Sequence, residues 1–195
     1  MKTFLIELKT SLLLTIIFAL LLCGAYPLAV WAGAQSLFPQ QANGSIIIDS
    51  NGIARGSRLL AQNLSSDKYF QPRPSAAGTG YDAANSSGTN LGPTSRKLSD
   101  RIKAAGAAYR VANNLSASAA IPADAVTSSG SGLDPHITPA NAGLQASRVA
   151  KVRGVSLEKI QTLVAQYTRD RDLGFFGEPT VNVLQLNRAL DEFFP

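Results

Sequence analysis

Glycine, serine, aspartate and histidine gather in residues 127–139, TSSGSGLDPHITP, where they could hold an anion or move a proton. A glycine-rich turn that leads into a helix start can aim backbone N–H groups at a phosphate. The spacing, however, is not G-x-G-x-x-G, and no G-K-S/T follows, so the phosphate signal is weak. The alternative is a tight structural turn ordered by Asp134 and the helix start. We call residues 127–139 the glycine-rich block.

The same block contains the groups of a nucleophilic triad, namely Asp134, His136 and a hydroxyl from Ser129 or Ser131. All of them lie within one short turn, and we expect that Asp134 and His136, two positions apart, do not line up. We therefore predict no catalytic residue, and Asp134 is expected to make structural hydrogen bonds. With one histidine and one cysteine in the chain, no histidine or cysteine metal centre is predicted either.

An apolar segment, residues 11–31, must position everything that follows it, because no charged residue occurs between Lys9 and Asp49. About 20 apolar residues cross a hydrocarbon core of about 30 Å as a helix, which satisfies its own backbone hydrogen bonds. Tyr26 and Trp31 lie near its end, where aromatic rings suit the membrane–water boundary. We predict an N-terminus over residues 1–10, a transmembrane helix over 11–33, a linker over 34–44 and a soluble domain over 45–195.

The distribution of charge predicts the orientation of this helix. Lys2 and Lys9 flank its N-terminal end, whereas the first basic residue on the other side is Arg55, beyond the range of the positive-inside bias. The short N-terminus is therefore expected to stay in the cytoplasm, and the soluble domain is expected outside it.

Two other interpretations of the apolar segment are open. A cleaved signal peptide is favoured by the small residues Ala32, Gly33 and Ala34, but its apolar core spans only about 7–15 residues, and this segment is longer. A lipoprotein site at Cys23 normally follows a small residue, and here Leu22 precedes it. We interpret the segment as a retained anchor, with Cys23 packed as a buried thiol in the membrane helix.

The remaining residues predict one α+β domain, because about 160 residues suffice to bury a real core. Its sheet is expected from residues 45–62 and 121–128, covered by about four helices. The net charge is +5, but the basic residues are dispersed, without a basic stripe interleaved with aromatic residues, so no nucleic-acid partner is predicted.

Local signals place the elements of this domain. Asn51 and Gly52 favour a hairpin turn between strands over 45–48 and 53–62, and a further short strand is expected over 121–127. Cap residues and glycine stops predict the helices 95–113 (cap Ser95 or Thr94), 139–153 (cap Thr138, stop Gly154), 157–171 (cap Ser156) and 183–194 (cap Asn182). Helical spacing predicts that the following face the core: Leu98, Ile102, Ala105, Tyr109, Leu157, Ile160, Val164, Tyr167, Leu184, Leu186, Leu190 and Phe193.

A long stretch without regular structure, residues 76–93, is rich in glycine, serine and asparagine. Such loops are usually functional or disordered, and a plain flexible linker has the same composition. Because linkers seldom contain residues such as Arg73, Tyr81 and Leu91 in and beside them, we predict an ordered contact loop.

Several motifs together resemble one family over nearly the whole chain. They follow the single membrane span in this order: YFQPRPSA (69–76), YD (81–82), SSGTNLGP (86–93), VTSSGSGLDPHI (126–137), QASRVA (145–150) and VNVLQLN (181–187). This pattern is similar to the KdpC family, the C subunits of Kdp-type potassium-transporting P-type ATPases. At Ser87 and Thr89 the family more often has glycine and serine, a conservative departure.

The resemblance implies a non-catalytic subunit of an inner-membrane complex, and the charge distribution predicts that its C-terminal domain lies in the periplasm. The implied partners are an ATP-hydrolysing P-type subunit, a channel-like potassium-binding subunit, a small single-helix subunit and membrane lipid. The implied role is assembly, stabilisation and regulation of these subunits. On this interpretation the loop 71–93 and the glycine-rich block are contact surfaces, and the expected subunit contacts are Arg73, Pro74, Tyr81, Asp82, Asn90, Leu91, Asp134, His136 and Arg148.

The family is also described as a catalytic chaperone that raises the ATP affinity of the hydrolysing subunit. That alternative implies a weak ATP contact, with no firmly bound cofactor and no metal, through Ser129, Gly130, Ser131, Gly132 and Gln145. Nothing in the composition or spacing shows nucleotide binding. The two roles conflict on topology, because ATP is on the cytoplasmic side, and the charge distribution therefore favours the structural and regulatory role.

Overall fold

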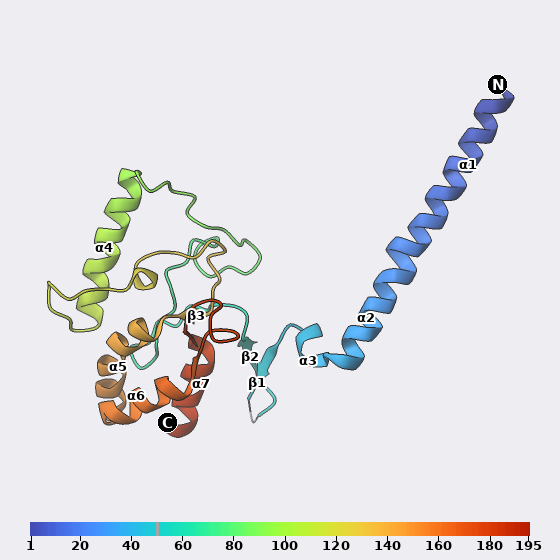
Figure 1. Cartoon of the computed structure of the whole chain (residues 1–195). Coiled ribbons are helices and arrows are strands. Elements are labelled where there is room, and N and C mark those ends of the chain that lie inside the picture. The colour runs from blue at the N-terminus through green and yellow to red at the C-terminus, as the bar shows by residue number, and fades with distance from the viewer. Residues whose placement is uncertain (50) are drawn as a thin grey trace. The chain divides into compact units, whose positions relative to one another are not determined.

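The computed structural model describes residues 1–49 and 51–195, so Ser50, within the predicted turn 49–52, lies outside the described residues (Figure 1). The chain forms two compact units, Met1–Arg55 and Gly56–Pro195. The prediction of one N-terminal membrane-length helix and a mixed α+β domain is confirmed.

The first unit is dominated by a single helix, Lys2–Leu37, of 36 residues, which is apolar and long enough to cross a membrane. It consists of α1 (Lys2–Ala19), a π-helical turn η1 (Leu20–Ala25) and α2 (Tyr26–Leu37). The wide turn has a local cause, because Pro27 has no N–H and its ring would press on the carbonyl four residues before it. The Tyr26 N–H accordingly bonds to Leu21 O, five residues back.

Helical structure continues into the predicted linker, since α2 runs to Leu37 and a short helix α3 covers Pro39–Ala42. A two-stranded sheet follows, made of β1 (Ile46–Ile48) and β2 (Ala54–Ser57). The carboxylate of Asp49 orders the turn between them, because its Oδ1 accepts the N–H groups of Asn51 and Ile53, both at 2.9 Å. The second strand is shorter than predicted.

The sheet of the second unit differs from the prediction. Its strands are β3 (His136–Ile137), β4 (Thr168–Arg169) and β5 (Thr180–Asn182), in the antiparallel order β3-β5-β4, with Ile137 and Thr168 both opposite Val181. The predicted strand over 121–127 was wrong: Ala123–Ala125 form a 3-10 turn, η2, preceded by Pro122. Residues 45–62 and 121–128 therefore do not share a sheet.

Four helices complete the second unit: α4 (Arg96–Ala112), α5 (Pro139–Arg153), α6 (Leu157–Gln166) and α7 (Val183–Phe193). The predicted caps Ser95, Thr138 and Asn182 each accept a backbone N–H from three residues further on, and Gly154 ends α5 at φ 65°. Helix α6 stops before the predicted Arg171, because Thr168 and Arg169 pair with β5 instead. Ser156 occupies the cap position of α6 without a side-chain cap bond.

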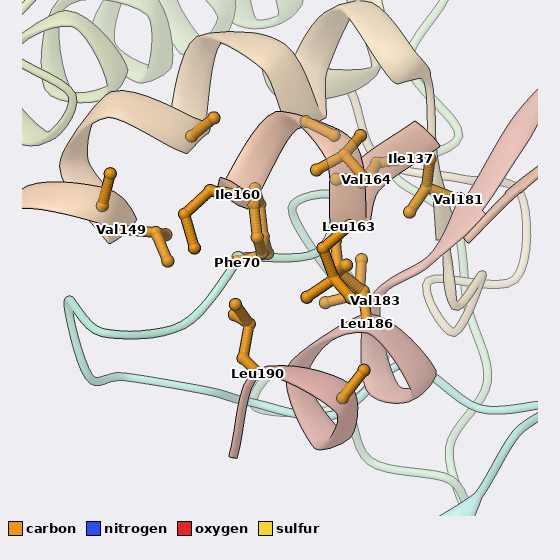
Figure 2. Packing of buried hydrophobic residues seen from close by; sticks show 14 residues of the cluster. Phe70, Ile137, Val149, Ile160, Leu163, Val164, Val181, Val183, Leu186 and Leu190 are labelled. Atoms are coloured by element: carbon orange, nitrogen blue, oxygen red, sulfur yellow. The ribbon is translucent and has the colours of Figure 1, made fainter. Parts of the chain in front are cut away.

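The core lies between α5, α6, α7 and the sheet, with Phe70 from the extended segment inserted among them (Figure 2). Both backbone groups of Phe70 bond to the side-chain amide of Asn187, at 2.8 Å each, so an irregular segment is fixed in an apolar interior. Two predictions of core residues were wrong, since Phe193 is 57% exposed and Leu157 is 39% exposed. Helix α4 is less buried than predicted, and only Gly106 of it is fully buried.

Candidate functional site

The loop 71–93 and the glycine-rich block are bonded to each other at several points. Ser131 O accepts the Ser87 N–H and the Ser86 hydroxyl, both at 3.0 Å, and Gly132 O accepts the Ser75 hydroxyl at 2.7 Å. Ser75 Oγ in turn accepts the Tyr81 N–H at 2.8 Å. The long loop is therefore ordered by the block, and the two form one surface.

Gly132 is the point of closest approach between the two segments. Its φ of +68° belongs to the left-handed region, and a Cβ there would lie 2.6 Å from Ser87 O and 2.7 Å from Ala77 N. A Cβ on Gly130 would meet no atom within 4 Å. The two glycines of the block are thus unlike, and only Gly132 is required by the packing of the backbone.

Asp134 joins the two segments through its charge. Its Oδ2 lies 3.1 Å from Arg73 Nη1, and its Oδ1 accepts the His136 N–H at 3.0 Å and lies 3.3 Å from His136 Nδ1. The expectation that Asp134 and His136 do not line up was therefore wrong, because an Asx-type turn folds the carboxylate back over the next two residues. Ser129 Oγ lies instead 3.4 Å from Ser131 Oγ, and among residues 1–49 and 51–195 neither hydroxyl bonds to His136.

Burial is the largest influence on the Asp134 carboxyl and by itself raises its pKa. The hydrogen bonds from His136 and the charges of His136 and Arg73 together outweigh burial, so the pKa of Asp134 is lowered from its ordinary value of 3.8. The carboxylate stays ionised and holds the loop and the block together.

Replacing the Asp134 carboxylate is expected to lower the free energy of unfolding by an amount that depends on pH. The pKa of Asp134 is lower in the folded chain than in the unfolded chain, so ionisation of this carboxyl stabilises the fold. This contribution is fully present above the unfolded-state pKa and is lost as the pH falls through the folded-state pKa. At pH 7 we expect Asp134→Asn to lower the free energy of unfolding by about 1–2 kcal/mol, and the difference from the wild type to shrink below about pH 4. Melting of the full chain in detergent across pH would show this. Asp100→Asn, on exposed α4, is the control, and a gap that does not change with pH would contradict the assignment.

An open cleft of about 700 Å³ lies beside the block. Arg73 reaches it, and in the described part of the chain its buried Nε has no hydrogen-bond partner. Two amides of the block are already used, since Gly132 N–H donates to Ser129 O and Leu133 N–H to Ser131 Oγ. The lining consists of Leu59, Leu60, Arg73, Ser86, Ser128, Ser129, Gly130, Ser131, Leu133, Asp134 and Pro135.

The other predicted residues of the loop serve its local shape. The Tyr81 hydroxyl donates to Arg73 O at 2.9 Å, and burial raises the pKa of this phenol. The pKa of Asp82 is lowered, first by the Asn85 side-chain hydrogen bond. Asn90, at φ 51°, is exposed, whereas Pro74 and Leu91 are half-buried.

Gln145 does not lie in the cleft lining; it is 1% exposed on α5. Its Oε1 accepts the Gln71 N–H at 2.7 Å and Arg148 Nη2 at 3.0 Å, and its Nε2 donates to Gln71 O at 3.1 Å and to Asn141 Oδ1 at 2.9 Å. The amide is thus saturated within the domain. The geometry gives Gln145 a structural role, and its predicted role in holding ATP stays a prediction.

Arg148, one turn further along α5, is 5% exposed. Its Nε donates to Asn113 Oδ1 at 3.0 Å, its Nη1 to Tyr69 O at 3.0 Å and to Asp67 O, and its Nη2 to Gln145. The guanidinium therefore pins the segment before the loop 71–93 onto α5 and the end of α4. Its predicted subunit contact also stays a prediction.

Sequence reasoning missed Asp124, whose carboxylate caps α5 from another segment. It accepts the Thr138 N–H at 2.8 Å, the Thr138 hydroxyl at 3.1 Å and Asn141 Nδ2 at 3.0 Å. The Tyr109 hydroxyl donates to Asn141 Oδ1 at 2.7 Å, and burial, followed by the charge of Asp124, raises the pKa of Tyr109. Ser75 was also missed. No local signal marked either residue, because Asp124 lies 14 residues before the cap Thr138 and Ser75 lies 57 residues before Gly132.

These features define a class of protein: an α+β domain behind a membrane-length helix, whose polar residues fasten two loops together. Among residues 1–49 and 51–195, no group of three His, Cys, Asp or Glu side chains is placed to hold a metal ion.

Residues 8–192 match the family described as KdpC: K+-transporting ATPase, c chain. Relatives named as the potassium-transporting ATPase KdpC subunit include those of Koribacter versatilis, 51% identical over 95% of this chain and 94% of the relative, and Rhodospirillum rubrum, 52% identical over 96% of each. A Mycobacterium bovis relative of the same name is 48% identical over 95% of this chain and 97% of its own. The chain belongs to the KdpC family, and the resemblance in its motifs is confirmed.

Proposed function

We propose that this chain is an accessory subunit of a potassium-transporting ATPase that assembles, stabilises and regulates the complex from outside the cytoplasm. Its relatives are named as a subunit of that ATPase. Its partners are then the ATP-hydrolysing and channel-like subunits, with a small single-helix subunit and lipid around its membrane helix.

The surface made by the loop 71–93 and the glycine-rich block is the proposed docking face for the channel-like subunit. The observation that carries this proposal is the bonding of the long loop onto the block through Ser75, Ser87 and Ser131. A loop held in one conformation loses little entropy when it meets a partner, so it binds more tightly than a flexible one. Exposed Asn90 and half-buried Arg73 and Leu91 lie on or beside this face.

The ATP-affinity role is the alternative function, and three observations weigh against it. The N–H groups of Gly132 and Leu133 already donate to Ser129 O and Ser131 Oγ within the turn, so fewer backbone donors are left to bind an anion. Gln145 is buried and saturated. The positive charge at the N-terminal end of the membrane helix also favours an extracytoplasmic domain, where ATP is absent.

Cysteine labelling tests the topology and the docking face together. Cys23 is the sole cysteine, so Cys23→Ser gives a background for Asn90→Cys on the loop and for Ser118→Cys, an exposed control between α4 and η2. We expect a membrane-impermeant maleimide to label both from outside intact cells when the chain is expressed alone. Co-expression with the other subunits should protect Asn90→Cys several-fold and leave Ser118→Cys unchanged.

Other results would redirect the proposal. Labelling that requires lysis of the inner membrane would place the domain in the cytoplasm and revive the ATP-affinity role. Equal labelling of both positions in the complex would move the docking face away from the loop 71–93.

A further inference from the structure

An apolar tip, residues 173–176, projects from the turn between β4 and β5. Leu173 is 82% exposed, Phe175 63% and Phe176 58%. Three large apolar side chains side by side in solvent mark a surface that is covered by something else in the assembled state.

The backbone holds the tip in one conformation. Asp172 and Phe176 exchange both backbone hydrogen bonds at 2.9 Å, and the rings of Phe175 and Phe176 lie 4.2 Å apart between centroids. Leu173 adopts φ 53°, a left-handed conformation that a leucine rarely takes. The backbone at Leu173 is therefore strained, and the three side chains still point into solvent. Strain of this kind often occurs at functional positions, which indicates a functional role for the tip.

Most charges beside the tip are paired, and exposed Asp170 is the exception in the described part of this turn. Arg169 pairs with Asp172, and Arg171 pairs with Glu178 at 2.7 Å. Residues 173–177 contain no charged residue. An apolar medium could therefore receive residues 173–177 without burying a charge, while Asp170 and the paired side chains stay at the level of the polar boundary.

Strand β5 connects the tip to the start of its own unit. Asn182, at the end of β5, donates from its Nδ2 to Arg58 O at 2.8 Å, and Arg58 is two residues from Gly56, where the unit begins. From Phe176 to Asn182 the chain spans at most about 20 Å, even fully extended. The tip therefore lies within about 20 Å of Asn182, which is bonded to the start of the unit, where the tether (residues 38–55) from the helix Lys2–Leu37 joins it.

We propose that the tip inserts into the boundary of headgroups and acyl chains of the bilayer that holds the chain's own helix. Leucine and phenylalanine are side chains that amphipathic segments bury at this depth. The short tether keeps the tip at a high effective concentration near one leaflet, so a weak insertion suffices. A protein pocket would also accept the tip, but the tether and the paired charges favour lipid. The proposal does not depend on the docking face above.

Lipid-borne quenching tests this contact directly. Trp31 is the only tryptophan, so Trp31→Phe with Phe175→Trp places a single indole in the tip. The full-length variant is reconstituted alone into phosphatidylcholine vesicles with or without brominated acyl chains. The matched control is Trp31→Phe with Val111→Trp, because Val111 is an apolar residue, 80% exposed, at the end of α4.

We expect brominated lipid to quench the tip indole at least about twofold more than the control indole, since quenching requires contact with the acyl region. Vesicles with added anionic lipid should not raise this quenching, because two arginines and three acidic residues flank the tip. Equal quenching at the two positions would overturn the proposal. A second result would also overturn it: brominated lipid leaves the tip indole unquenched, and the other subunits alone shield this indole from aqueous iodide. That result would assign the tip to a protein pocket.

Discussion

Arg148→Met is expected to destabilise the full chain by about 3 kcal/mol in the free energy of unfolding. The substitution leaves Asn113 Oδ1 without its donor in a buried site and also removes the donor of the Asp67 and Tyr69 carbonyls, which are only partly buried. Each buried acceptor left unpaired costs about 1–3 kcal/mol, and the apolar methionine, which removes a buried charge, offsets part of the sum. Thermal melting in detergent, followed by near-ultraviolet circular dichroism, would show a fall of roughly 6–12 °C.

The matched control is Arg96→Met, which removes the same side chain from the start of α4. Arg96 is 95% exposed and lies 3.8 Å from Asp100 in an i,i+4 pair, which contributes at most about 0.5 kcal/mol. If the two variants melt within about 2 °C of each other, Arg148 does not hold the segment before the loop 71–93. Loss of complex assembly without a change in melting would instead support the predicted subunit contact.

Elements set by local chemistry were predictable from the sequence. Ser95, Thr138 and Asn182 cap helices because their side chains reach a backbone N–H only three residues away, and Gly154 ends α5 because glycine takes a positive φ at little cost. The membrane-length helix was equally visible, since it needs only a long uncharged run.

Elements set by distant partners were not predictable. The local sequence predicts the end of a helix at Thr168 and Arg169, but in the fold these residues pair with β5. It predicts a strand over residues 121–127, but in the fold Asp124 bonds to the start of α5. The same holds for the site. The motif around Gln145 and Arg148 pointed to ligand or subunit contact, whereas both side chains bond to segments more than 30 residues away, which their spacing could not show.

Gly132→Ala is expected to detach the loop 71–93 from the glycine-rich block, with a loss of about 3 kcal/mol. A non-glycine residue at φ +68° costs roughly 1–2 kcal/mol by itself. The new Cβ would also overlap Ser87 O at 2.6 Å and Ala77 N at 2.7 Å, and both are backbone atoms that cannot swing aside. Limited proteolysis of the full chain should then cut within residues 76–93 several-fold faster than in the wild type.

Gly130→Ala is the control two positions away. With no atom within 4 Å of its Cβ and no positive φ, it should leave stability unchanged or raise it by up to about 1 kcal/mol, by restricting the unfolded chain. The pair separates two meanings of the same glycine-rich sequence. If the block served a phosphate, a methyl on exposed Gly130 would disturb the ligand as readily as one on buried Gly132. If the block instead holds the loop 71–93 in place, only Gly132→Ala should impair assembly of the complex and potassium uptake. Equal effects of both substitutions would contradict the proposed docking face.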